Sequence, residues 1–239
     1  MTTEIATIDS AWGAGENIDA SDVKLSKIWL MQGSSKAVKK KSAQIGELID
    51  SITLEKYGDE KTPVELIVFD KNKIFEVCKQ VPGERQEKFV KYVDITPENR
   101  NTEFEPGDGN RWRVCYNFFC LLVTKKGLKD LPVVVSMRKT STDTAKGLIS
   151  TFGVWAKHQK PSAHKVIKLS SEYVEDENPY HVFTFKEGRE TTKEELAEAF
   201  GWYKNIRDSK IKATVDQSDV EGEEIPGKNT VDSETSFMS

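Results

Sequence analysis

Two nearly continuous apolar runs, joined by a short charged connection, most constrain the fold of this chain. Residues 111–123 read RWRVCYNFFCLLV and residues 131–137 read LPVVVSM. Apolar runs of strand length that are rich in β-branched and aromatic residues are typical of buried strands. The connection at residues 125–130 contains Lys, Gly and Asp, which favour a hairpin. The sequence therefore predicts a sheet with these two strands side by side at its centre.

Further strand patterns flank the central pair. Alternating or clustered apolar residues predict strands at 27–32, 45–53, 64–70, 165–169 and 180–185. The sequence GDGN at 107–110 predicts a turn directly before the strand at 111–123.

Two helices are predicted after the central strands. The first begins near Ser141, Thr142 or Asp143, which can each cap a helix, and its apolar stripe is Ala145, Leu148, Ile149 and Phe152. The second has Thr192 and Glu195 at the spacing of a capping box, and its stripe is Leu196, Ala199, Phe200, Tyr203 and Ile206. This order predicts an α+β fold. It fits a partly open antiparallel barrel of the oligonucleotide-binding (OB) type with added helices, and it also fits other α+β folds.

Charge is divided unevenly along the 239 residues. Residues 1–22 carry five acidic residues and no Lys or Arg, and residues 216–239 carry seven acidic residues against one lysine. The part between them holds 27 acidic and 34 basic residues, so the net charge of −4 conceals a basic body. A basic body between acidic flanks favours a polyanion as partner. The alternative is that the flanks only add solubility.

The same patterns divide the chain into three segments. Residues 1–22 are polar and without periodicity, which predicts a flexible acidic arm. Residues 23–212 hold every predicted strand and helix, and we expect them to form one OB-like nucleic-acid-binding domain. Residues 213–239 lack an apolar run that could be buried, which predicts a disordered acidic tail.

No catalytic motif stands out. The chain has no phosphate-binding loop, no glycine-rich dinucleotide turn, no nucleophile elbow and no His-Glu-x-x-His motif, so we expect no enzyme activity and no cofactor. A metal-dependent nuclease would need converging carboxylates near a lysine, and its candidates are Asp50, Glu65, Asp70 and Lys73. Surface acids at strand ends are the preferred interpretation.

Neither a metal site nor a membrane segment is expected. The three histidines and three cysteines have no metal-ligand spacing, and the cysteines are interpreted as reduced core residues. No apolar run is long enough to span a bilayer, and no secretory signal is recognised. These features favour a cytoplasmic location.

Basic and aromatic residues together indicate binding of single-stranded nucleic acid. Such proteins combine a cationic groove for phosphates with aromatic faces for bases, each stack contributing about 1–3 kcal/mol. The expected phosphate contacts are Lys39, Lys40, Lys41, Arg111, Arg113, Lys126, Arg138 and Lys139. The expected stacking residues are Trp29, Trp112 and Tyr116. The alternative for the aromatic residues is core packing, and for the cations it is an ordinary solvated surface.

Arg138 and Lys139 also precede the hydroxyls of the first predicted helix. Free backbone N–H groups at a helix N-terminus favour anions, so this turn is a candidate phosphate site. The alternative is an ordinary capped helix start with solvated charges.

Residues 24–208 resemble a group of tailed-bacteriophage early proteins of the single-stranded DNA-binding type. The resemblance lies in the stretches KIWLMQGSSKAVKKKSAQIGELIDSITLEKYG, PVVVSMRKTSTDTAKGLIS and HKVIKLSSEYVEDENPYHVFTF. Its patterns are Met31-Gln32, Gly46-Glu47, Asp50-Ser51 and the segment from Ser136 to Lys146. The resemblance implies an oligonucleotide-binding fold, no catalysis, and a role in phage DNA replication or recombination.

The expected function is a bacteriophage protein that coats single-stranded DNA without strong sequence preference in the cytoplasm of the bacterial host. Residues 216–239 would recruit replication or recombination proteins and compete with DNA for the groove. The alternative is a phage regulator that binds a host protein, such as the transcription machinery, through the same acidic tail. The two differ in whether removal of the tail spares or abolishes binding.

Overall fold

The structure, a computed structural model, describes residues 25–80, 87–103, 107, 109–177 and 179–208. The predicted arm at 1–22 and the predicted tail at 213–239 lie outside these residues. The strands are β1 (Ser26–Leu30), β2 (Leu48–Asp50), β3 (Lys56–Gly58), β4 (Val64–Gln80), β5 (Glu87–Asp94), β6 (Arg111–Thr124), β7 (Gly127–Leu128), β8 (Val133–Arg138), β9 (Lys165–Val174) and β10 (Tyr180–Glu190). The helices are α1 (Lys36–Lys39), α2 (Thr142–Lys157) and α3 (Lys193–Asp208), with short 3-10 turns at Lys139–Ser141 (η2) and Ser162–His164 (η3).

The ten strands found among the described residues belong to one sheet, which confirms the α+β class. The strand order is β10-β9-β4-β6-β8-β1-β2-β3, with β5 paired to β4 and β7 paired to β6. The predicted neighbours β6 and β8 pair in antiparallel register from Cys115 opposite Arg138 to Cys120 opposite Val133. The sequence predicted an antiparallel sheet, and this is wrong at one pair of strands, because β1 and β8 are parallel.

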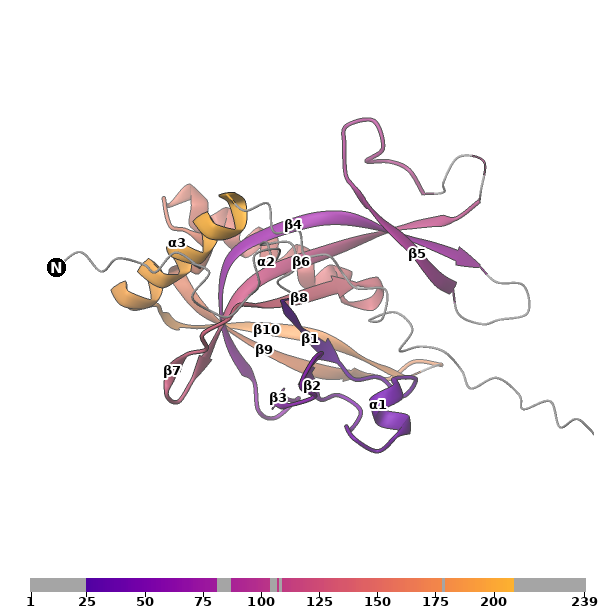
Figure 1. Cartoon of the computed structure of the whole chain (residues 1–239), viewed down its shortest axis with the longest axis horizontal. Helices are drawn as coiled ribbons and strands as arrows, with labels where there is room; N and C mark the ends of the chain where they lie inside the picture. The colour runs from indigo at the N-terminus through magenta and orange to yellow at the C-terminus, as the bar shows by residue number, and fades with distance from the viewer. Residues whose placement is uncertain (1–24, 81–86, 104–106, 108, 178, 209–239) are drawn as a thin grey trace, which may run out of the picture.

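The longest strand is β4, and the sequence predicted only its first part. It pairs with β6 from Glu65 to Cys78, and its other edge is shared by β9 near its start and β5 near its end. Residues 71–73 are polar and exposed, but the strand continues through them because pairing with β6 is unbroken there and Ile74 and the four residues after it are buried. The β4–β5–β6 end therefore projects from the body, opposite the end that carries β7 and α3 (Figure 1).

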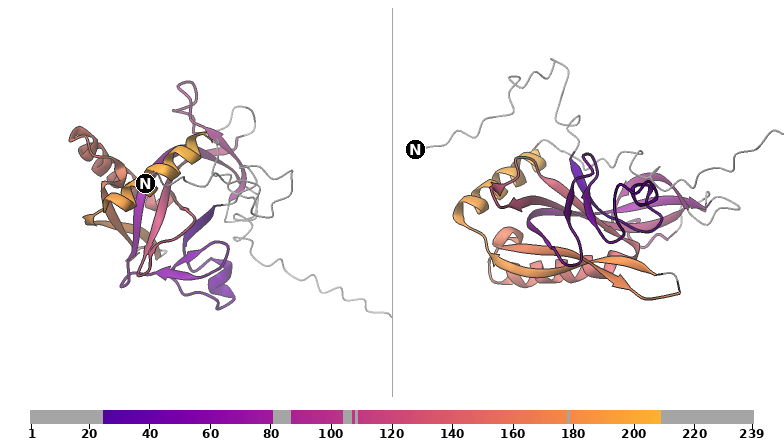
Figure 2. Two further views of the ribbon diagram at one scale, coloured as in Figure 1. Left: turned by 60° about the vertical axis from the view of Figure 1, so that its left-hand side comes forward. Right: turned by 90° about the horizontal axis from the view of Figure 1, so that it is seen from below.

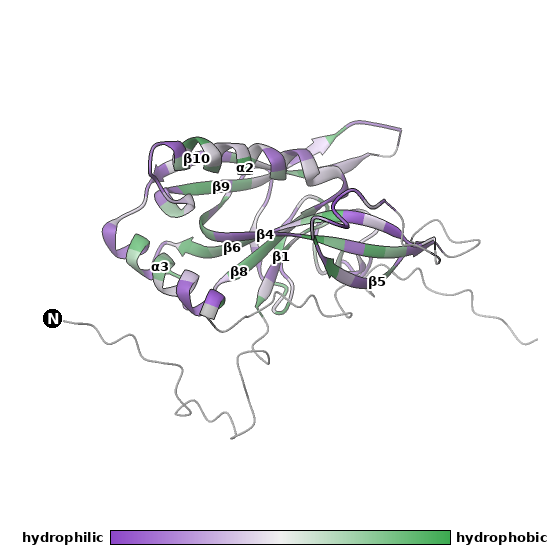
Figure 3. Cartoon of the chain, turned by 90° about the horizontal axis from the view of Figure 1, so that it is seen from above, coloured by the Kyte–Doolittle hydropathy of each residue, from purple (hydrophilic) through white to green (hydrophobic). Residues whose placement is uncertain are grey.

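Two hydrophobic layers cover opposite faces of the sheet. Residues such as Phe118, Val135 and Leu169 on one face pack against Leu148 and Phe152 of α2. Residues of the other face, including Phe119 and Leu121, pack in a second cluster with Ala199 and Ile206 of α3. The two helices accordingly lie against different parts of the sheet (Figure 2). Hydrophobic colouring is concentrated along β6 and β9 and alternates with hydrophilic colouring along β5 (Figure 3).

Both predicted helices are present, with one change in each buried stripe. The capping box of α3 is formed, since the Thr192 N–H donates to Glu195 Oε2 at 2.8 Å and the Glu195 N–H donates to Thr192 Oγ1 at 3.2 Å. Phe200 was expected in the stripe of α3, but it is 55% exposed and stacks on Tyr203. In α2 the stripe extends one turn further, to Trp155.

The sheet curls until β10 meets the end of β1, and side chains close the gap. Gln32 Nε2 donates to the His181 carbonyl at 2.8 Å, and the His181 N–H donates to Gln32 Oε1 at 3.0 Å. The Phe183 N–H donates to Ser141 Oγ, and Thr144 Oγ1 donates to the Phe183 carbonyl. Side chains thus take the place of a neighbouring strand along this edge of β10, because buried backbone polar groups need partners. We call these four hydrogen bonds the edge clasp.

Gly46 lies against the edge clasp and has no room for a side chain. Its φ is +83°, and a Cβ there would lie 2.8 Å from the imidazole of His181. Its carbonyl accepts a 2.6 Å hydrogen bond from Ser171 Oγ on β9, which ties the β1–β2 connection to the far end of the sheet.

We predict that Gly46→Ala lowers the free energy of unfolding by about 2 kcal/mol, because it adds a left-handed alanine and a steric conflict. Gly33→Ala is the matched control, since the nearest atom to its Cβ would be Ile45 Cδ1 at an ordinary 3.7 Å. The control should be unchanged or more stable by up to about 1 kcal/mol. Urea unfolding of both variants measures the difference, and equal stability of the two would contradict this account.

Candidate nucleic-acid interface

Two hollows share Lys139 as a lining residue. The first has a volume of about 240 Å³ and is bordered by β1, the start of α1, β5, the end of β8 and the turn into α2. The second, of about 580 Å³, is bordered by the start of β6, by Glu103, and by Lys139 and Thr142. Because Lys139 lines both, the two hollows adjoin at the turn between β8 and α2.

The first hollow combines aromatic rings with cations. Trp29 and Tyr92 are half-buried in its wall, and Phe183 is buried there with 4% of its surface exposed. The cations among its lining residues are Lys27, Lys36, Arg138 and Lys139. This combination of aromatic faces and positive charge is what single-stranded nucleic acid requires.

Register explains how three strands bring these side chains together. Tyr92 on β5 is opposite Glu76 on β4, and Glu76 is opposite Arg113 on β6, so these three side chains share one face of the sheet. Phe89 lies beside Tyr92 on the same strand, with ring centroids 4.6 Å apart.

An ion pair crosses this face. Arg138 on β8 donates from NH1 to Oε1 of Glu76 on β4, reaching across the intervening strand β6. The side chain of Glu76 is 3% exposed and that of Arg138 is 31% exposed. Cys115 lies beneath, opposite Arg138, and burial raises the pKa of its thiol to about 12. The thiol is therefore protonated at neutral pH and is not a nucleophile.

Lys139 occupies the turn between β8 and α2 in an unusual conformation. Its φ is +50°, in the left-handed region that few non-glycine residues adopt. The side chain is exposed and lines both hollows. Backbone strain of this kind persists where the surrounding structure determines the conformation, and it is concentrated at functional sites.

The second hollow contains the three predicted residues at the start of β6. Arg111 is exposed, whereas Trp112 and Arg113 are half-buried. The ring of Trp112 packs on Phe75 with centroids 5.1 Å apart, and its indole nitrogen is buried without a hydrogen-bond partner among the described residues. Trp112 thus lines the hollow, although its ring packs on Phe75, on the face of the sheet opposite to Arg111 and Arg113.

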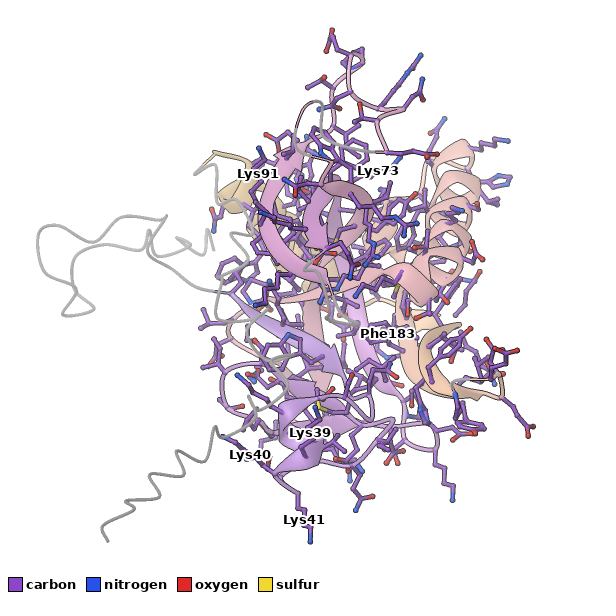
Figure 4. The ribbon with its side chains drawn as sticks, turned by 90° about the vertical axis from the view of Figure 1, so that its right-hand side faces the viewer. Lys39, Lys40, Lys41, Lys73, Lys91 and Phe183 are labelled. Atoms are coloured by element: carbon purple, nitrogen blue, oxygen red, sulfur yellow. The ribbon has the colours of Figure 1, made fainter. Side chains whose placement is uncertain are left out.

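The predicted lysine cluster adjoins the first hollow at α1, whose first residue, Lys36, lines that hollow. Lys39, Lys40 and Lys41 follow one another at the end of α1 and are exposed, on one side of Phe183 in Figure 4. Lys73 and Lys91 lie on the other side of Phe183 in that view, but the register places them opposite Tyr116 and Val77, on the face of the sheet turned away from Tyr92. None of these five lysines lines either hollow.

Two predicted contacts lie away from the hollows. Tyr116 is 8% exposed and belongs to the core under α2, so packing replaces the stacking role that the sequence suggested. Lys126 lies in the turn between β6 and β7, at the opposite end of the molecule from α1 and β5 (Figure 1). Six predicted residues do line the hollows: Trp29, Arg111, Trp112, Arg113, Arg138 and Lys139.

Two hydroxyls at the start of α2, those of Ser141 and Thr144, form hydrogen bonds within the fold. Ser141 and Thr144 both bind the backbone of Phe183. Lys139 and Thr140 remain at the rim of the first hollow, so the cationic part of the predicted turn faces the candidate interface.

The acids considered for a nuclease are held in separate places. Burial raises the pKa of Asp50, but hydrogen bonds from Tyr57 and from the N–H groups of Thr53 and Ile52 outweigh burial, so its pKa is lowered. Glu65 pairs with Lys168 at 3.3 Å, and Asp70 pairs with Arg207 at 3.2 Å. Within the described part of the chain, His, Cys, Asp and Glu form no group of three that could hold a metal ion.

The expected contacts did not include Tyr92, Lys36 or Gln32, which line the first hollow. Tyr92 lies in the run KFVKYVD, whose alternation of apolar and polar residues was a usable strand signal. Lys36 belongs to the same basic cluster as its predicted neighbours at 39–41. Gln32 is part of the Met31-Gln32 pattern, but its hydrogen-bond partner lies 149 residues away, so the local sequence does not indicate its role.

None of the helices among the described residues is long and apolar enough to span a membrane.

Comparison with known proteins identifies one family. The family described as Pam3 phage gp34-like protein has a sequence model that matches residues 2–212. No curated protein and no solved structure matches the chain.

We predict that Lys139→Gly does not lower the free energy of unfolding and raises it by up to about 1 kcal/mol, because glycine adopts a positive φ without strain. Lys146→Gly, at an exposed position within α2, is the matched control and should lower stability by about 1 kcal/mol. Thermal or urea unfolding compares the two. A loss of similar size at both positions would show that the turn at Lys139 is not strained.

Proposed function

Because the chain belongs to the Pam3 phage gp34-like protein family, we propose that this bacteriophage protein binds single-stranded DNA without strong sequence preference during phage replication or recombination. One observation carries the proposal. The two adjoining hollows bring Trp29 and Tyr92 together with Arg111, Arg138 and Lys139. Stacked bases and a neutralised phosphate backbone are the interactions that such a surface offers.

The topology supports an OB interpretation of the body. Counting β4, β6, β8, β9 and β10 as strands one to five gives the sheet path 5-4-1-2-3, and α2 lies between the third and fourth strands. In OB folds, oligonucleotides bind on the second and third strands and at the loop between the first two. Here those elements are β6, β8 and the excursion that contains β5, and they border the hollows. Strand β1, which is outside this count, pairs with β8 on one edge and with β2 on the other.

Charge supports the same location. Lys36 lines the first hollow, and the exposed Lys39, Lys40 and Lys41 follow it at the end of α1. A strand that leaves the hollow past α1 can therefore meet several lysines. Exposed lysines are long and mobile, which suits contacts to phosphates without regard to sequence. Cations flanking aromatic residues would hold the backbone while bases stack in the hollow.

We predict that the chain binds oligo-dT with an affinity that falls steeply with salt. Neutralising four to six phosphates gives a slope of log affinity against log salt of about −3 to −4, at about 0.7 per contact. Lys139→Gln should make this slope less steep by about 0.7 because one contact is lost. Lys126→Gln is the matched control and should not change it, since Lys126 lies at the other end of the molecule. Quenching of tryptophan fluorescence at several salt concentrations measures the slopes.

Single-stranded DNA, double-stranded DNA and RNA oligomers should be compared in the same titration. Absence of binding to oligo-dT, or an affinity independent of salt, would refute the proposal. If Lys139→Gln and Lys126→Gln weaken binding equally, the chain binds DNA, but the hollows are not its binding site.

The acidic residues from 216 onward distinguish this proposal from its rival, a regulator that binds a host protein through the tail. We predict that a chain ending at residue 215 binds oligo-dT as tightly as the full chain or more tightly, because seven acidic residues that repel or compete with DNA are removed. The titration above measures this, and pull-down from host extract with both chains is the control. Loss of DNA affinity on truncation would contradict the proposed role of the groove.

A further inference from the structure

Glu76 is a buried acid in the middle of a surface that we propose binds a polyanion. It is 2% exposed, although it stands between the hollow-lining residues Tyr92 and Arg113 in the register of the sheet. A negative charge here repels phosphates, so charge alone gives no reason for its presence at a DNA-binding surface. Asp50 is also a buried acid, but its carboxylate binds the turn that follows it.

The contacts of Glu76 point to Arg138. Oε1 of Glu76 accepts a hydrogen bond from Arg138 NH1, and Oε2 is buried without a partner among the described residues. A carboxylate oxygen without a partner costs about 1–3 kcal/mol, and a buried ion pair is weak evidence for a role in stability. The pair therefore calls for an explanation other than stability.

Geometry supplies that explanation. Arg138 is opposite Cys115 on β6, Cys115 is opposite Ile74 on β4, and Glu76 lies two residues beyond Ile74 on the same face. The Arg138 side chain must cross β6 diagonally to reach Glu76, over the small side chain of Cys115. Its guanidinium is then held at the wall of the first hollow.

We infer that Glu76 is a positioning residue for DNA binding, which holds the guanidinium of Arg138 in a fixed plane so that Arg138 binds one phosphate at the first hollow. The inference rests on the proposed function. A guanidinium carries five N–H donors in a rigid fork, and a fixed fork loses less entropy when it binds a phosphate than a lysine does. Glu76 thus contributes to affinity through Arg138 in spite of its own charge.

The direction in which one substitution changes the affinity for oligo-dT tests this inference. Glu76→Gln removes a negative charge, so electrostatics alone predicts tighter binding of oligo-dT. Loss of positioning predicts binding weaker by about tenfold or more, the size of one charge-assisted hydrogen bond, and a salt slope less steep by about 0.7. Glu65→Gln is the matched control on the same strand, because it also breaks one ion pair but lies outside the hollows. It should bind as the original chain does or slightly more tightly.

A second substitution keeps the test decisive if Glu76→Gln fails to fold. Arg138→Lys preserves the charge but loses the fork, so it should weaken binding by a similar factor. Arg207→Lys, at an arginine paired with Asp70 on another surface, should not weaken it. Circular dichroism and thermal unfolding establish that each variant is folded. Unchanged or tighter binding by Glu76→Gln and Arg138→Lys would refute the inference, whereas failure of the original chain to bind oligo-dT would refute the proposed function itself.

Discussion

The edge clasp is the constraint on which the rest of the structure depends. Without a neighbouring strand, the N–H and carbonyl groups of His181 and Phe183 would lack partners in a partly buried region. Gln32, Ser141 and Thr144 supply those partners from the β1–α1 connection and from the start of α2. The clasp holds β10 against the β1–α1 connection and the start of α2, and the first hollow lies beside it, with Gln32, Ser141 and Phe183 in its wall.

The surface around the hollows departs from the apolar pattern of the core. Asn117 is buried, yet it donates to Asn72 Oδ1 at 3.0 Å and accepts from Ser136 Oγ at 2.7 Å across three strands. Glu76 and Arg138 form a second polar connection between the same outer strands. Buried polar groups with satisfied hydrogen bonds restrict how strands can pair. The contacts of Asn117 therefore favour one register of β4, β6 and β8, and with it the positions of the side chains at the hollows.

Much of the fold was predictable because its signals are local. The hairpin of β6 and β8, the capping box at Thr192 and Glu195, and the apolar stripe of α2 each depend on residues close in sequence. The continuation of β4 through residues 71–73 was missed because a polar interruption resembles a strand end. The parallel pairing of β1 with β8 was missed because it joins residues more than 100 positions apart.

The candidate site was predictable in part for the same reason. Arg111 and Trp112, like Arg138 and Lys139, are adjacent in sequence and remain together in the hollows. Tyr116 showed the limit of the approach, because strand alternation divides side chains between two faces but does not tell which face α2 covers. The roles of Gln32, Gly46 and the segment 136–146 became clear only in three dimensions, where they hold β10 or line the hollow.

The central claim is that single-stranded DNA lies in the two hollows, and photo-crosslinking tests it most directly. The full chain is irradiated with oligonucleotides that carry 5-bromodeoxyuridine, and the crosslinked peptides are identified by mass spectrometry. The account predicts crosslinks at Trp29 and Tyr92, the aromatic residues in the wall of the first hollow. Crosslinks confined to the exposed aromatic residues of α3, Phe200 and Tyr203, would contradict it.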